Sequence, residues 1–74
     1  MREKVLEVLR EVRSDVDFEH ETKLIDDGIL DSFDIIAIVS ELNERFDIEI
    51  TADELEPENF NTLDAITSLV KSLQ

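Results

Sequence analysis

The chain has 74 residues, of which 20 are acidic and 7 basic, and its formal net charge is −13 at pH 7. A chain this short forms one small domain with a marginal core, and a surface this acidic repels nucleic acid and anionic membranes while attracting basic proteins. No cysteine and no bilayer-length apolar segment is present, and the amphipathic start differs from a signal peptide, so we expect a monomeric, cytoplasmic, single domain over residues 1–74.

The first predicted element is an amphipathic helix close to the amino terminus. Four apolar residues repeat at helical spacing and form one stripe: Val5, Val8, Leu9 and Val12. Leu6 lies on the flank of this stripe. Arg10 and Arg13 follow near the negative end of the helix dipole, where basic side chains are favourable.

A long connection follows, over residues 14–31. It carries five large apolar residues: Phe18, Leu24, Ile25, Ile29 and Leu30. So many apolar side chains in an irregular segment indicate a loop that packs over the core. Thr22 and Gly28 are predicted turn positions, and His20, between two glutamates, is expected to be exposed to solvent.

The strongest predicted helix runs from Ser32 to about Phe46. Its apolar face has the spacing of a helix stripe: Ile35, Ile38, Val39, Leu42 and Phe46. Phe33 and Ile36 point away from that stripe. Two interpretations of this apolar pair remain open, because it could pack under the preceding loop or form a docking patch for a partner protein.

The remaining chain predicts one short helix and one longer helix. Thr51 and Glu54 have the spacing of a capping box, and the short helix that they open is expected to end before Pro57. Asn61 is predicted to cap the last helix, whose buried face comprises Leu63, Ile66, Leu69, Val70 and Leu73. The expected fold is an all-α, small four-helix bundle with three main helices, one short helix and a long first loop.

Few residues could carry chemistry. A catalytic triad would require His20 to reach Ser32, together with a pocket and an oxyanion hole that such short helices can hardly build, so we expect no enzyme and no catalytic residue. The glycine loop does not match a calcium-binding loop, because Gly28 at the sixth position places Lys23 first and Ile25 third. No metal site is predicted.

Ser32 is the remaining candidate, with two interpretations. It could be an ordinary helix-capping serine. It could also accept a group from another enzyme, because a hydroxyl at the positive end of a helix dipole is well placed to hold a phosphodiester.

The segment Leu24–Phe33, with Asp31-Ser32 before a bulky apolar residue, resembles the phosphopantetheine attachment motif of the acyl carrier protein family. The segments Glu41–Ile50 and Phe60–Leu63 extend this resemblance over nearly the whole chain. The residues that lead into the second predicted helix, Ile29–Ser32, are similar to those of stand-alone carriers paired with adenylating ligases, including D-alanyl carrier proteins.

The resemblance implies a four-helix carrier that holds 4'-phosphopantetheine covalently on Ser32, with Asp31 assisting the magnesium-dependent transfer. The arm's thiol would carry an acyl or aminoacyl group as a thioester for fatty acid, polyketide or related biosynthesis. Implied partners are a phosphopantetheinyl transferase, an acyl- or aminoacyl-activating ligase, and synthases and transferases with basic docking surfaces. The implied recognition face comprises Phe33, Ile36, Ala37, Ser40, Glu41 and Glu44. A short acyl chain could enter the core between six residues: Ile35, Ile38, Val39, Leu42, Ile66 and Leu69.

The sequence departs from the fatty-acid-synthesis carriers at three positions. Phe33 stands where those carriers usually have leucine, and Ala37 and Asn43 stand where acidic residues are expected. Cargo and pathway therefore stay open. The alternative function is an acidic helical inhibitor of a basic enzyme, which accounts for the charge and for the exposed Phe33 and Ile36 but gives Ser32 no role.

Overall fold

The computed structural model describes all residues from Met1 to Gln74, and its regular secondary structure consists of helices alone. Its elements, in chain order, are α1 (Arg2–Val12), α2 (Ser32–Phe46), the single 3-10 turn η1 (Ala52–Glu54), α3 (Pro57–Phe60) and α4 (Leu63–Leu73). Three long helices, one short helix and a long first loop confirm the predicted all-α architecture. No helix combines the length and the hydrophobicity needed to cross a membrane.

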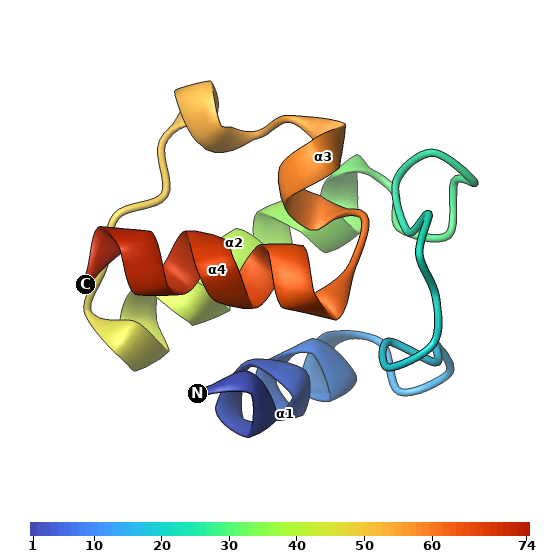
Figure 1. Ribbon diagram of the computed structural model, residues 1–74, viewed down its shortest axis with the longest axis horizontal. Coiled ribbons are helices and arrows are strands. Elements are labelled where there is room, and N and C mark those ends of the chain that lie inside the picture. Colours follow the sequence, from blue (N-terminus) through green and yellow to red (C-terminus); the bar gives the residue numbers. More distant parts are fainter.

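The helices surround one core. α1 packs against both α2 and α4, and α3 packs against α4. In Figure 1, α4 lies in front of α2, α1 runs below them, and both chain ends lie on the left. The long loop between α1 and α2 forms the right edge, next to the start of α2 and close to α3. The loop and the beginning of α2 therefore lie at the same end of the molecule.

Fifteen buried hydrophobic residues form the core. The predicted stripes of α1, α2 and α4 all contribute to it, with Val5 and Leu9, Ile38 and Leu42, and Ile66 and Val70 fully buried. The loop contributes Phe18, Leu24 and Leu30, which are at most 4% exposed, so the prediction of a loop packed over the core is confirmed. Gly28 has a φ of 71°, in the left-handed region that glycine adopts readily, which confirms its turn position.

The prediction of a short helix that ends before Pro57 is confirmed. The Thr51–Glu54 capping box is present, with Thr51 N donating to Glu54 Oε2 over 2.6 Å, and it opens the single turn of η1, which ends at Glu54. Pro57 then begins a further short helix that was not predicted, α3, at its first helical position. Proline is favoured there, because its fixed φ suits a helix and the first turn needs no amide donor from it. Phe60, at the end of α3, is buried in the core.

The prediction that Asn61 caps the last helix is wrong. Thr62 caps α4, and its hydroxyl accepts a hydrogen bond from Ala65 N over 2.9 Å. Asn61 Oδ1 instead accepts hydrogen bonds from Ile25 N (3.0 Å) and Asp26 N (3.1 Å), and its backbone oxygen accepts one from Leu24 N (3.0 Å). Asn61 therefore ties the long loop to the junction between α3 and α4.

We predict that Asn61→Ala detaches this part of the loop. The substitution leaves the Ile25 and Asp26 amides without their acceptor, and we expect the free energy of unfolding to fall by about 1–2 kcal/mol in urea denaturation. Amide hydrogen exchange at these two residues should accelerate. Asn59→Ala removes a different side-chain hydrogen bond, to Glu54 O, and should leave exchange at Ile25 and Asp26 unchanged. Unaltered exchange in Asn61→Ala would contradict the assignment.

Candidate functional site

Two reciprocal hydrogen bonds close the first turn of α2 around Ser32. Asp31 is the N-cap residue, and its Oδ1 accepts a hydrogen bond from Asp34 N over 2.9 Å. Asp34 Oδ2 in turn accepts one from Asp31 N over 3.3 Å, which completes a capping box. The interpretation of Ser32 as an ordinary capping serine is therefore wrong, because Asp31 holds that position and Ser32 is the first residue inside the helix.

Ser32 is exposed, and its hydroxyl has no hydrogen-bond partner in the protein. Asp31 takes up the amides of Asp34 and Ile35, the first through its side chain and the second through its backbone oxygen at 3.0 Å. The amides of Ser32 and Phe33 have no hydrogen-bond acceptor in the protein. Free amides at the positive end of a helix dipole bind anionic oxygens, so this turn fits a phosphodiester joined to the Ser32 hydroxyl.

Arg13, directly after α1, reaches this turn from the other side of the long loop. Its Nη1 donates to Asp34 Oδ2 over 2.6 Å and to Ile29 O over 3.4 Å, while Nε and Nη2 each donate to Asp15 over 2.9 Å. The hydrogen bonds to Asp15 and then to Asp34 raise the pKa of the Arg13 guanidinium above its ordinary value. The hydrogen bond from Arg13 is also the main reason that the pKa of Asp15 is lowered.

The predicted recognition residues lie along α2 from Phe33 to Glu44. Phe33 and Ile36 are 83% and 64% exposed, so the interpretation that they pack under the loop is wrong. Ser40 and Glu44 are exposed as well, and Ala37 is half-buried. These residues form a continuous outward strip that begins next to Ser32.

Glu41, the other predicted recognition acid, has an internal partner. Arg45 Nε lies 3.8 Å from Glu41 Oε2, and Arg45 Nη2 binds Glu11 on α1 over 2.6 Å. The hydrogen bond that Arg45 donates to Glu11 is the largest cause of its raised pKa, and Glu41 adds a smaller contribution. Part of the charge of Glu41 is therefore neutralised inside the protein, whereas Glu44 makes no ion pair.

His20 does not join the site. Its side chain is 83% exposed, as predicted, and Nδ1 lies 2.9 Å from Asp17 Oδ2 in the same loop. No hydrogen bond connects His20 with Ser32. No group of three or more histidine, cysteine or acidic residues is arranged to hold a metal ion.

A small groove lies between the long loop, the first turn of α2, and α3 with the residues just before it. Its volume is about 120 Å³, and it is lined by Ile25, Ile35, Leu55, Glu56, Pro57 and Phe60. Of the six residues expected to admit an acyl chain, only Ile35 lines this groove. Ile38, Leu42 and Ile66 are fully buried in the filled core.

Sequence reasoning did not find the connections that Arg13 and Asn61 make. Arg13 was expected only to complement the dipole of its own helix, and its contact with Asp34 spans 21 residues. Such a pairing has no local sequence signature. The acid three residues after Asp31 was the one available signal, because a capping box at that spacing indicates that the carboxylate of Asp34 turns back toward the helix start.

A short helical bundle that presents an exposed, unpartnered serine at the start of its second helix has the arrangement of a carrier domain. Residues 1–70 match the family model described as phosphopantetheine attachment site. The chain is 32% identical to the D-alanyl carrier protein of Listeria monocytogenes, over 99% of this chain and 96% of the relative. It is 29% identical to the D-alanyl carrier protein of Bacillus cereus, over 99% of this chain and 95% of the relative. The chain belongs to the phosphopantetheine-binding carrier protein family, whose covalent cofactor is 4'-phosphopantetheine.

Proposed function

We propose that the chain is an aminoacyl carrier protein and that Ser32 bears the arm. The observation that carries this proposal is the exposed Ser32 hydroxyl beside the free amides of Ser32 and Phe33. The arm, once attached, supplies a thiol that holds the cargo as a thioester. No base of the protein is hydrogen-bonded to the Ser32 hydroxyl, so a transferase must activate it, and the chain acts as a carrier rather than as an enzyme. Residues 1–74 act as one carrier domain, and the cytoplasm stays its predicted compartment.

Asp31 is proposed to assist the attachment of the arm. Its Oδ1 is occupied by the cap to Asp34, whereas its Oδ2 has no partner in the protein. A free carboxylate oxygen next to the acceptor serine is a suitable ligand for the magnesium ion of the transferase, because magnesium prefers oxygen ligands. One carboxylate thereby orders the helix start and offers an oxygen to the incoming enzyme.

An amino acid is the proposed cargo, with D-alanine as the first to test. Two relatives that the chain matches over nearly its full length are D-alanyl carrier proteins. The filled core agrees with a small cargo, because a longer acyl chain would have to part the helices, whereas an aminoacyl group at the tip of the arm needs no interior space. Fatty acid and polyketide partners, which the resemblance also implied, receive no such support.

The proposed partners are a phosphopantetheinyl transferase, an aminoacyl-activating ligase and the transferase that removes the cargo. The strip from Phe33 to Glu44 is the proposed docking face, with an exposed apolar start and an acidic end. Apolar contacts next to Ser32 would orient the partner, and Glu41 and Glu44 would draw in its basic surface. Charge-steered contacts form and break quickly, as a carrier that visits several enzymes requires.

Intact mass spectrometry tests the attachment site. After incubation with coenzyme A, magnesium and a broad-specificity phosphopantetheinyl transferase, the protein should gain the mass of one phosphopantetheine. Ser32→Ala should gain nothing, because the acceptor oxygen is gone. Ser68→Ala, which removes an exposed serine of α4 outside the proposed docking face, should be modified like the parent. No gain by the parent with an active transferase would favour the inhibitor function instead.

Asp31→Asn should slow the modification while preserving the fold. Asparagine is as good an N-cap residue as aspartate, so the thermal midpoint should stay close to that of the parent. The lost charge should weaken magnesium binding, and we expect a roughly tenfold lower rate of modification. Asp27→Asn, an equal charge change in the exposed loop, is the control and should retain the rate. Equal rates for parent and Asp31→Asn would remove Asp31 from the site.

Charge reversal at Glu44 tests the docking face. Glu44→Lys should lower the kcat/KM of modification several-fold at low salt, because it repels a basic partner surface, and the difference should shrink as salt screens the charges. Glu3→Lys makes the same charge change on α1, away from the proposed face, and should have a much smaller effect. Glu41 is less suitable, because its reversal also disturbs Arg45. A loss that does not depend on salt would argue against electrostatic docking.

A further inference from the structure

Arg13 and the first turn of α2 form one connected unit. Asp34 Oδ2 accepts both the Arg13 guanidinium, at 2.6 Å, and the Asp31 amide, at 3.3 Å. The oxygen that closes the capping box is therefore the same one that the arginine holds. The Asp34 side chain is only 15% exposed, whereas that of Arg13 is 31% exposed, so this carboxylate is largely withdrawn from solvent.

The arginine is itself held in place. Its backbone N–H donates to Leu9 O over 2.9 Å at the end of α1, and its guanidinium is held from the other side by two hydrogen bonds to Asp15. It also donates to Ile29 O over 3.4 Å, in the last stretch of the loop before Asp31. A planar fork with several fixed donors can bind these acceptors together, which the single ammonium of lysine cannot do.

We propose that Arg13 is a positioning residue for the attachment of the arm: it neutralises Asp34 and keeps the capping box closed, so that the Ser32 hydroxyl is presented in one orientation. This inference rests on the proposed function of Ser32. Without Arg13, Asp34 is a largely withdrawn carboxylate that faces the carboxylate of Asp31 across one helical turn, with no counter-charge. The favourable response of Asp34 is to rotate toward solvent, which releases the Asp31 amide and loosens the turn that contains Ser32.

A positioning role for Arg13 affects the orientation of the Ser32 hydroxyl but not the docking of the partner enzyme. Arg13 is no part of the strip from Phe33 to Glu44, so removing its side chain leaves the proposed partner contacts in place. We expect Arg13→Gln to lower the kcat of phosphopantetheine transfer roughly threefold to tenfold, since small misplacements of a reacting group are costly, with the KM for the carrier changed less than about twofold. Hydrogen exchange at the Asp31 and Asp34 amides should accelerate in parallel.

Three further variants separate positioning from general damage. Arg10→Gln removes the same charge from the same end of α1 together with its ion pair to Glu19, and should behave like the parent. Arg13→Lys restores the charge without the fork and should recover part of the loss. Arg13→Gln combined with Asp34→Asn removes the unpaired carboxylate, and both kcat and amide protection should recover relative to Arg13→Gln alone. Circular dichroism of each variant confirms the fold.

The outcomes decide the proposal in either direction. Equal kcat and equal protection in Arg13→Gln and Arg10→Gln would overturn it, as would a change confined to KM or a double variant no better than Arg13→Gln. If Arg13→Gln does not fold, Arg13→Lys decides: a kcat and amide protection equal to those of Arg10→Gln would overturn the proposal, and a lower kcat with faster exchange at the Asp31 amide would support it. A parent chain that the transferase does not modify would instead refute the proposed function, and the exchange rates would still show whether Arg13 holds the turn.

Discussion

The reciprocal capping of α2 is the interaction on which the site depends. A helix start exposes amide groups that need acceptors, and here two carboxylates, Asp31 and Asp34, satisfy one amide each across a single turn. The pair would repel each other without a cation, and Arg13 supplies it from the end of α1. The amides that the box leaves free, those of Ser32 and Phe33, lie beside the hydroxyl of Ser32, the proposed attachment point of the anionic arm.

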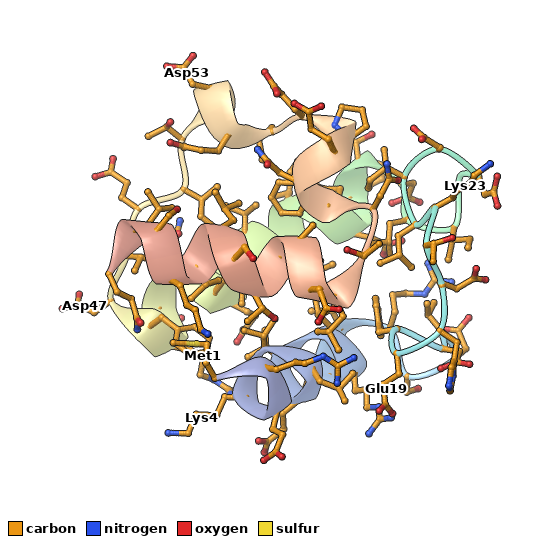
Figure 2. All side chains as sticks on the ribbon, viewed as in Figure 1. Met1, Lys4, Glu19, Lys23, Asp47 and Asp53 are labelled. Carbon is orange, nitrogen blue, oxygen red and sulfur yellow. The ribbon has the colours of Figure 1, made fainter.

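The long loop makes this geometry stable in a small protein. A 74-residue chain has few helices with which to fix a helix start, and the loop compensates by contributing Phe18, Leu24 and Leu30 to the core. Asn61 binds the middle of the loop and Arg13 binds its end, so the chain reaches α2 along a defined path. Figure 2 shows the side chains of this end of the molecule around the loop, with Lys23 at its outer edge and Glu19 next to the end of α1, where it pairs with Arg10.

The charges around α2 divide into those paired within the protein and those left free at its surface. The chain carries a net charge of −13, yet two arginines at α2 form ion pairs within the protein, Arg13 with Asp34 and Arg45 with Glu11. Asp34 and Glu11 are thereby neutralised, whereas Glu44 makes no ion pair and is exposed on the same helix as Phe33 and Ile36. A surface of this kind attracts basic partners without binding them permanently, which suits a protein that passes its cargo on.

The sequence by itself determined the three long helices and the carrier family, because helical periodicity and the Asp31-Ser32 motif are local properties of the chain. It predicted the buried stripes of α1, α2 and α4 and the packed loop, and its motif matched the family that the comparisons later showed. Only the tertiary structure decided that Phe33 and Ile36 face solvent, that Pro57 begins a helix, and that Arg13 and Asn61 bind partners 21 and 36 residues away. Those outcomes depend on which segments meet in space. The residues next to a side chain in the sequence do not show whether it hydrogen-bonds to a distant segment or points into water.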